Sequence, residues 1–123
     1  MAGTPRELLR EILMELNRSA GVYASALVSR DGLLVASVMP EDVDAEAFAA
    51  MTATMLGAAE TAFSELKRGV AERVIVEGSR AKIVAMGAGK DLILVSMSEP
   101  TATLGLILHQ MGKSVEKVKK VFA

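Results

Sequence analysis

The stretch from Asp44 to Arg68 constrains the fold of this chain most, because it reads as one long helix without an ordinary solvent-facing side. Placed on a wheel of about 100° per residue from Phe48, its larger apolar residues form a wide stripe that faces the protein's own core. The stripe comprises Phe48, Thr52, Met55, Ala59, Ala62, Phe63 and Leu66. The spacing therefore predicts a helix that packs on a sheet.

The opposite side of this helix is small and mostly uncharged, with Ala50, Ala53, Thr54, Gly57, Thr61 and Ser64 along it. No charged residue lies between Glu46 and Glu60. A mid-helix glycine costs about 1 kcal/mol relative to alanine, so a compensating contact is expected. A second backbone that approaches closely along these small residues would supply it. The alternative is an alanine-rich helix that merely tolerates small surface residues.

Composition favours one domain, residues 1–123, that associates with another chain. Of the 123 residues, 51% are hydrophobic, and such excess apolar surface on a small domain suggests oligomerisation. The chain has no cysteine, which excludes disulfides and thiolate chemistry. A net charge of −1 and 3% aromatic residues argue against nucleic-acid binding, which requires clustered cations and stacking rings.

The hydropathy pattern predicts a cytoplasmic protein without a membrane span. No apolar run approaches the roughly 20 residues that a spanning helix needs. The N-terminus lacks the apolar core of a signal peptide, because Arg6, Glu7, Arg10 and Glu11 interrupt it.

Capping and turn signals divide the rest of the chain. Thr4-Pro5-Arg6-Glu7 is a capping box that opens a helix ending near Asn17. Strands are predicted at 22–29 and 33–38, joined by an Arg30-Asp31-Gly32 turn with positive φ at both central positions. After the long helix, which Gly69 closes, three strands follow at 72–77, 81–86 and 92–98, and a last helix at 101–122. The last two strands are nearly continuously apolar, so both sheet faces should be covered.

No residue of the chain is predicted to be catalytic, to hold a cofactor or to bind a metal. Gly87-Ala88-Gly89-Lys90 is similar to a phosphate loop, but Asp91 replaces the hydroxyl residue and would repel phosphate. The only histidine, His109, lies off the apolar stripe of its helix. The acidic residues at 41–46 suit the start of a helix, and a contact to a cationic patch on a partner is the alternative.

Two segments carry a resemblance to a known family. They are Val28-Ser29-Arg30-Asp31-Gly32-Leu33-Leu34-Val35-Ala36-Ser37 and Ser98-Glu99-Pro100-Thr101-Ala102-Thr103-Leu104-Gly105-Leu106. Together with the alanine-rich helix between them, they make the chain resemble a roadblock domain over essentially its whole length. This family comprises roadblock-type dynein light chains and bacterial and archaeal regulators of Ras-like GTPases.

The resemblance implies a profilin-like α+β sandwich of order α-β-β-α-β-β-β-α. Its five-stranded antiparallel sheet would carry the long helix on one face and the terminal helices on the other. It also implies a homodimer joined by the long helices and by edge pairing of the strand after them. The implied dimer residues are Met51, Met55, Ala58, Ala62, Arg73, Val74, Ile75 and Val76. The implied partner-binding residues are Ala50, Ala53, Thr54, Gly57, Glu60, Thr61 and Ser64. Spacing does not decide which of them face the sister chain and which a partner.

These features favour a non-enzymatic, dimeric interaction module that binds and regulates or scaffolds a Ras-like small GTPase. The family resemblance supplies the GTPase. The alternative is a small-molecule-sensing α/β domain, which would require a roomy pocket with convergent polar groups. An enzyme would require perturbed titratable pairs, which the sequence hardly supplies.

Overall fold

Three helices and five strands make up the computed structural model, which describes residues 3–122. In chain order they are α1 (Pro5–Asn17), β1 (Val22–Ser29), β2 (Leu34–Val38), α2 (Ala45–Glu65), β3 (Arg73–Glu77), β4 (Lys82–Gly87), β5 (Leu92–Ser98) and α3 (Leu104–Val121). This is the predicted order, with small differences at the element ends. The predicted domain, 1–123, runs past the described residues at both ends.

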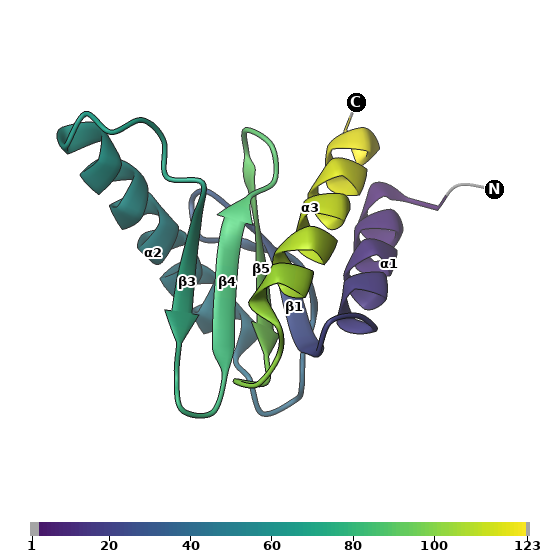
Figure 1. Cartoon of the computed structure of the whole chain (residues 1–123). Helices are drawn as coiled ribbons and strands as arrows, with labels where there is room; N and C mark the ends of the chain where they lie inside the picture. Colours follow the sequence, from purple (N-terminus) through teal and green to yellow (C-terminus); the bar gives the residue numbers. More distant parts are fainter. Residues whose placement is uncertain (1–2, 123) are drawn as a thin grey trace.

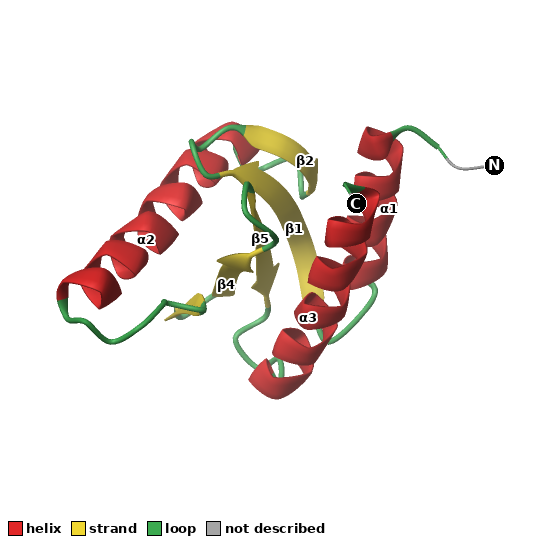
Figure 2. Cartoon of the chain, turned by 90° about the horizontal axis from the view of Figure 1, so that it is seen from above, coloured by secondary structure: helices red, strands yellow, loops and turns green. Residues whose placement is uncertain are grey.

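The strands form one antiparallel sheet in the order β2-β1-β5-β4-β3. Helix α2 covers one face, and α1 and α3 lie side by side on the other (Figure 1). The view from above in Figure 2 separates the three layers, with the sheet between the helices. The α+β sandwich predicted from the sequence is therefore confirmed.

Each face of the sheet has its own apolar layer. Leu13 of α1 and Met111 of α3 are fully buried with Leu94 of β5 on the terminal-helix side. Leu56 of α2 packs with Ile93 on the other side. Alternate residues of a strand point to opposite faces, so a strand covered on both sides must be apolar throughout. This requirement explains the continuous apolar runs of β4 and β5.

Local signals fix the terminal helices. The capping box at the start of α1 is present: the Glu7 N–H donates to the Thr4 hydroxyl oxygen at 3.2 Å, and the Thr4 N–H donates to Glu7 at 3.4 Å.

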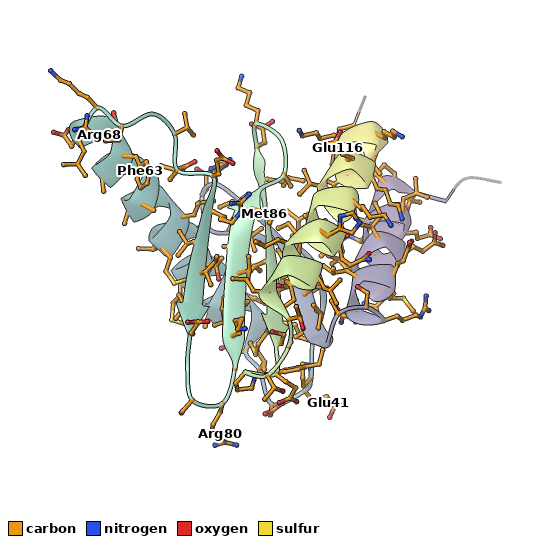
Figure 3. The ribbon with its side chains drawn as sticks, viewed as in Figure 1. Glu41, Phe63, Arg68, Arg80, Met86 and Glu116 are labelled. Carbon is orange, nitrogen blue, oxygen red and sulfur yellow. The ribbon has the colours of Figure 1, made fainter. Side chains whose placement is uncertain are left out.

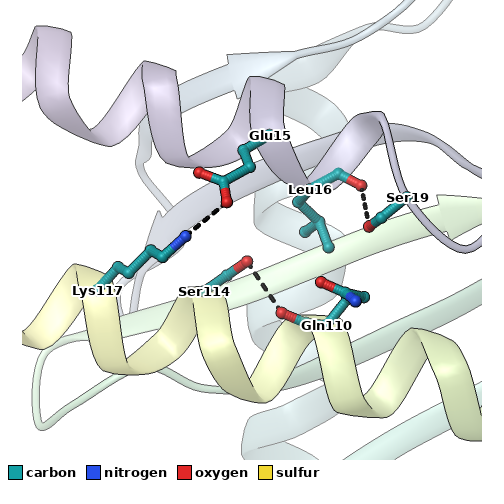
Figure 4. Close-up of polar contacts among 6 residues, drawn as sticks. All are labelled: Glu15, Leu16, Ser19, Gln110, Ser114 and Lys117. Atoms are coloured by element: carbon teal, nitrogen blue, oxygen red, sulfur yellow. Dashed lines mark hydrogen bonds and ion pairs between the residues drawn. The ribbon is translucent and has the colours of Figure 1, made fainter.

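An ion pair joins the two terminal helices. Between α1 and α3, Lys117 Nζ donates to Glu15 Oε1 at 2.6 Å (Figure 4). The lysine's hydrogen bond and charge lower the pKa of Glu15. Both side chains are largely exposed, so the pair contributes little to stability.

The first hairpin differs from its predicted geometry. Positive φ was expected at both central positions of the turn, but among its residues only Gly32 has it, at 90°. The Ser29 N–H donates to the Leu33 carbonyl at 2.8 Å, and the Gly32 N–H donates to the Ser29 carbonyl at 3.0 Å. This is the longer hairpin loop in which a single left-handed glycine restores the twist of the strands.

The end of α2 also differs from its prediction. The helix ends at Glu65, and the left-handed residue after it is Lys67, with φ of 54°. The Arg68 N–H donates to the Phe63 carbonyl at 3.0 Å, and the Lys67 N–H donates to the Ser64 carbonyl at 3.1 Å. These two bonds form a Schellman motif. Gly69 lies beyond that motif and does not close the helix.

Candidate interaction surface

The first half of α2 is anchored firmly to the sheet. The carboxylate of Asp44 caps the helix by accepting from the Ala47 N–H at 3.1 Å. An acidic cap also complements the positive end of the helix dipole. The buried residues of the helix, all from this half, are Phe48, Ala49, Thr52, Ala53 and Leu56.

The core-facing stripe predicted for α2 was only partly right. Phe48 and Thr52 are buried and Met55 and Ala59 half-buried, whereas Ala62, Phe63 and Leu66 are exposed. The helix is rotated toward Ala49, Ala53 and Leu56, and its last turns, from residue 61 onward, are exposed. The predicted stripe was defined by large apolar side chains. The first hairpin, which packs against α2, instead requires small side chains where the two meet.

Gly32 in the first hairpin explains part of the small-residue side of α2. A Cβ atom built at Gly32 would lie 3.4 Å from the Cα of Ala50 and 3.9 Å from the Cβ of Ala53. Ala53 is 9% exposed, so it departs from the partner surface on which it was predicted to lie. The close backbone approach expected at these two alanines is thus supplied by the chain itself. At Gly57, by contrast, nothing lies within 4 Å of a built Cβ.

Beyond Glu60, α2 loses its cover. Every residue of 61–70 is exposed, and we call this segment the overhang. Its large apolar side chains are strongly exposed, with Phe63 at 40%, Leu66 at 66% and Val70 at 77%. Figures 1 and 3 show this end of α2 extending past β3, with Phe63 and Arg68 at its far end. Exposed apolar side chains that lie together in this way make the overhang a candidate interaction surface.

The neighbouring edge strand, β3, is also open. It pairs with β4 on one side only, and its central residues Ile75 and Val76 are 38% and 41% exposed. Its outward-pointing backbone groups and β-branched side chains are a template for pairing with another strand. The overhang and β3 lie at the same side of the molecule, so one partner would cover both.

The opposite edge strand, β2, is protected by α1. Arg10 Nη1 donates to the Ser37 carbonyl at 3.0 Å, and Asn17 Nδ2 donates to the Val38 carbonyl at 3.0 Å. Within residues 3–122, no side chain makes a comparable hydrogen bond to the backbone of β3. The two edge strands therefore differ, because α1 holds the end of β2 by two side-chain bonds and β3 has no such contact.

The other residues predicted for dimer and partner contacts are spread along the whole of α2 and β3. Exposed members are Ala50, Met51, Thr54, Ala58, Thr61, Ala62, Ser64 and Arg73, together with Ile75 and Val76. Half-buried members are Met55, Gly57, Glu60 and Val74. Sequence reasoning missed Leu66 and Val70, and it missed the ion pair between Glu60 and Arg30, 2.7 Å long. Helix length offered a signal for Leu66 and Val70. A helix of 21 residues is about 31 Å long and a five-residue strand about 17 Å, so the helix extends past the strand.

The sites considered and rejected from the sequence have ordinary geometry. The loop after β4 is a hairpin in which the Ala88 N–H donates to the Leu92 carbonyl at 2.8 Å. His109 is exposed. No cluster of three metal-ligating side chains occurs within residues 3–122. Over the same residues, no helix combines the length and apolar character that crossing a membrane requires.

A shallow pocket of about 290 Å³ lies where the β4–β5 hairpin meets the end of α3. Its charged lining residues are Lys90, Asp91 and Lys119, on an otherwise apolar surface. Three charges at an open rim do not supply the convergent polar groups that a small-molecule sensor requires. This pocket therefore gives the sensor hypothesis no specific support.

Comparison with known proteins decides the family. The model of the Roadblock/LC7 domain matches residues 8–98, which include all five strands and α2. The chain belongs to the Roadblock/LC7 domain family. This confirms the family resemblance. Of the two segments that suggested it, 28–37 lies inside the match and 98–106 lies beyond it except for Ser98.

This Roadblock/LC7 domain has a sequence relative in an archaeon and shares its fold with two bacterial proteins. Uncharacterized protein MJ1340 of Methanocaldococcus jannaschii is 37% identical over 115 residues, which cover 94% of this chain and 100% of the relative. The structure of MglB from Myxococcus xanthus superposes with a TM-score of 0.90 at 20% identity, covering 99% of this chain and 92% of MglB. The gliding protein MglB of Thermus thermophilus gives 0.87 at 22% identity, covering 98% and 93%. At these identities the two structures establish the shared fold.

Proposed function

We propose that this Roadblock/LC7 domain is a cytoplasmic, non-enzymatic homodimer that binds a Ras-like small GTPase and regulates or scaffolds it. The observation that carries the proposal is the exposed apolar overhang beside the open edge of β3. A second copy of the chain fits this surface, because pairing two β3 strands would extend the sheet under both overhangs. The interface would be isologous, with the same patch on both chains.

The side chains support the same assembly. Phe63 and Leu66 follow the sheet-facing stripe of α2 but lie where this chain's own sheet has ended. The sheet of a second chain, continued across β3, would supply the missing layer. Burying a large apolar side chain contributes about 1.5–3 kcal/mol, and a symmetric dimer counts each contribution twice. A partner would bury the exposed part of each side chain, 40% of Phe63 and 66% of Leu66.

The outer side of α2 suits a GTPase as the partner. Ala50, Thr54, Gly57 and Thr61 present small side chains, so another backbone can approach closely. The domain would act by position: holding the switch segments of a GTPase in one arrangement orders the residues that hydrolyse GTP. A guanidinium could also contact a bound GTPase: Arg30 is paired with Glu60, whereas Arg68, Arg73 and Arg80 are exposed.

Gly57→Arg tests the proposal because it should stabilise the folded chain and at the same time weaken its association with a partner. A built Cβ at Gly57 meets nothing within 4 Å, and arginine favours a helix by nearly 1 kcal/mol over glycine, so the folded chain should become more stable by about that amount. The long charged side chain should at the same time block close approach of a sister chain or a GTPase.

The readouts are thermal unfolding, mass by light scattering, and capture of Ras-like GTPases loaded with GTP or GDP. Gly112→Arg is the matched control, because Gly112 is an exposed residue of α3 with nothing within 4 Å of its built Cβ. Unchanged mass and unchanged GTPase capture for Gly57→Arg would count against the proposed surface. A monomeric parent that captures no GTPase would refute the function itself.

A further inference from the structure

Arg30 lies at a junction of three elements that its position in the sequence does not reveal. Its backbone N–H donates to the Asp91 carbonyl at 3.2 Å, just after β1. Its guanidinium donates through Nη1 to Glu60 of α2 at 2.7 Å and through Nη2 to the Gly89 carbonyl at 3.5 Å. The side chain thus connects the end of the first hairpin strand to α2 and to the β4–β5 turn.

The guanidinium lies directly over Gly87, the last residue of β4. A Cβ atom built there would lie 2.8 Å from Arg30 Nη2, closer than real Cβ atoms approach another atom. Any larger residue at 87 would therefore displace the guanidinium. The space that Arg30 occupies is open only because residue 87 is glycine.

One atom of the Arg30 side chain, Nε, does not contribute to the stability of the fold. This atom is buried and has no hydrogen-bond partner among residues 3–122. A buried, unpaired polar atom costs free energy that a hydrophobic residue would not incur. An arrangement that carries this cost requires a reason other than the stability of the fold.

Glu60 lies at the boundary between the anchored and the uncovered part of α2. It is half-buried, and every residue of the overhang, 61–70, is exposed. Within residues 3–122, no side-chain hydrogen bond or ion pair joins the overhang to the rest of the chain. The Arg30–Glu60 pair is thus the last polar link between the helix and the body of the domain before the overhang.

We propose that Arg30 is a positioning residue for the interaction surface: through Glu60 it fixes the direction of the C-terminal half of α2. A helix end held in one direction loses less freedom when a partner binds, which raises affinity without adding a contact. This inference rests on the proposed function for the identity of the partner. The coupling between Arg30 and α2 is a property of the single chain.

Gly87→Ala tests the proposal without altering Arg30 or Glu60. The added methyl displaces the flexible end of Arg30, and Gly87 has no positive φ that would strain an alanine. Amide hydrogen exchange over residues 57–66 should become about fivefold faster at a dilution where both proteins are monomeric, the factor expected for losing one partly exposed, charge-assisted bond. The NMR signal of the Arg30 Nε–H should shift, which reports the displacement independently.

Self-association should weaken by up to about 25-fold in Gly87→Ala, because one such bond, worth about fivefold, is lost in each of the two chains. Gly112→Ala is the matched control, since the same change on α3 meets nothing within 4 Å. Glu60→Gln should reproduce the effects if Gly87→Ala fails to fold, and Arg30→Lys, which keeps the charge, should be milder than Arg30→Gln.

Unchanged exchange over 57–66, with a shifted Arg30 Nε–H signal, would overturn the positioning role. The positioning role would also be overturned if association weakened only in proportion to a loss of unfolding free energy. A parent that neither dimerises nor captures a GTPase would refute the proposed function, and the exchange measurement would still decide whether Arg30 positions α2.

Discussion

Ile75, at the middle of β3, offers a substitution that separates association from folding. In an antiparallel pair, the backbone groups of successive residues point alternately to the neighbouring strand and away from it. The Gly78 N–H donates to the Ala81 carbonyl at 2.8 Å, so the register places Val76 and Ile83 in a hydrogen-bonded pair. The N–H of Ile75 consequently points to the open edge.

Ile75→Pro should abolish strand pairing between chains and leave the β3–β4 ladder intact. Proline tolerates an edge position when the missing N–H faces outward. Two lost N–H···O bonds, one from each chain, remove about 2 kcal/mol at about 1 kcal/mol each. Ile75 is 38% exposed, so losing its interface burial removes up to about 1 kcal/mol from each chain. The total of about 3–4 kcal/mol raises the dimer Kd by about 10²- to 10³-fold.

Analytical ultracentrifugation over a concentration series measures this Kd, and circular dichroism measures folding. Val76→Pro is the control, because its N–H faces β4 and its loss should destabilise the fold by about 3 kcal/mol or more. A folded Ile75→Pro protein with the Kd of the parent would refute edge pairing. If Ile75→Pro destabilised the fold as much as Val76→Pro, the Ile75 N–H would not point to the open edge as assigned.

Two smaller predictions concern stability. Lys67→Gly should raise the free energy of unfolding by about 0.5–1 kcal/mol, because Lys67 holds a left-handed φ of 54° that glycine adopts without cost; urea unfolding that shows no gain would contradict this. Lys117 lowers the pKa of Glu15, so their pair stabilises the folded state at neutral pH, and this contribution is lost as pH falls from 4.5 through the lowered pKa. The difference in Tm between the parent and Glu15→Gln should therefore shrink over that range, and a difference that stays constant would contradict the assignment.

The elements were predictable because their signals are local. The capping box at Thr4, the glycine turn at Gly32 and the continuous apolar runs of the last two strands each act over a few residues, and each appears in the structure. The chain order of helices and strands follows from them. The arrangement of the layers came from the family resemblance, and the sheet confirms it.

The rotation of α2 and the Arg30–Glu60 pair could not be read from local patterns. Both depend on contacts between segments far apart in sequence: Gly32 against Ala50 and Ala53, and Arg30 with Glu60, 30 residues away. Hydrophobic periodicity ranks side chains by size and polarity. It contains no information on a hairpin backbone that requires alanines in the helix it packs against, or on a sheet that ends before the helix above it.

The unequal edges of the sheet set how many copies strand pairing can join. In the proposed dimer each chain would use one edge strand, β3, so this kind of contact would have a valence of one per chain. Strand pairing through β3 would then stop at two chains, because it uses the open edge of each. The bonds of Arg10 and Asn17 to the end of β2 would hinder pairing at the opposite edge.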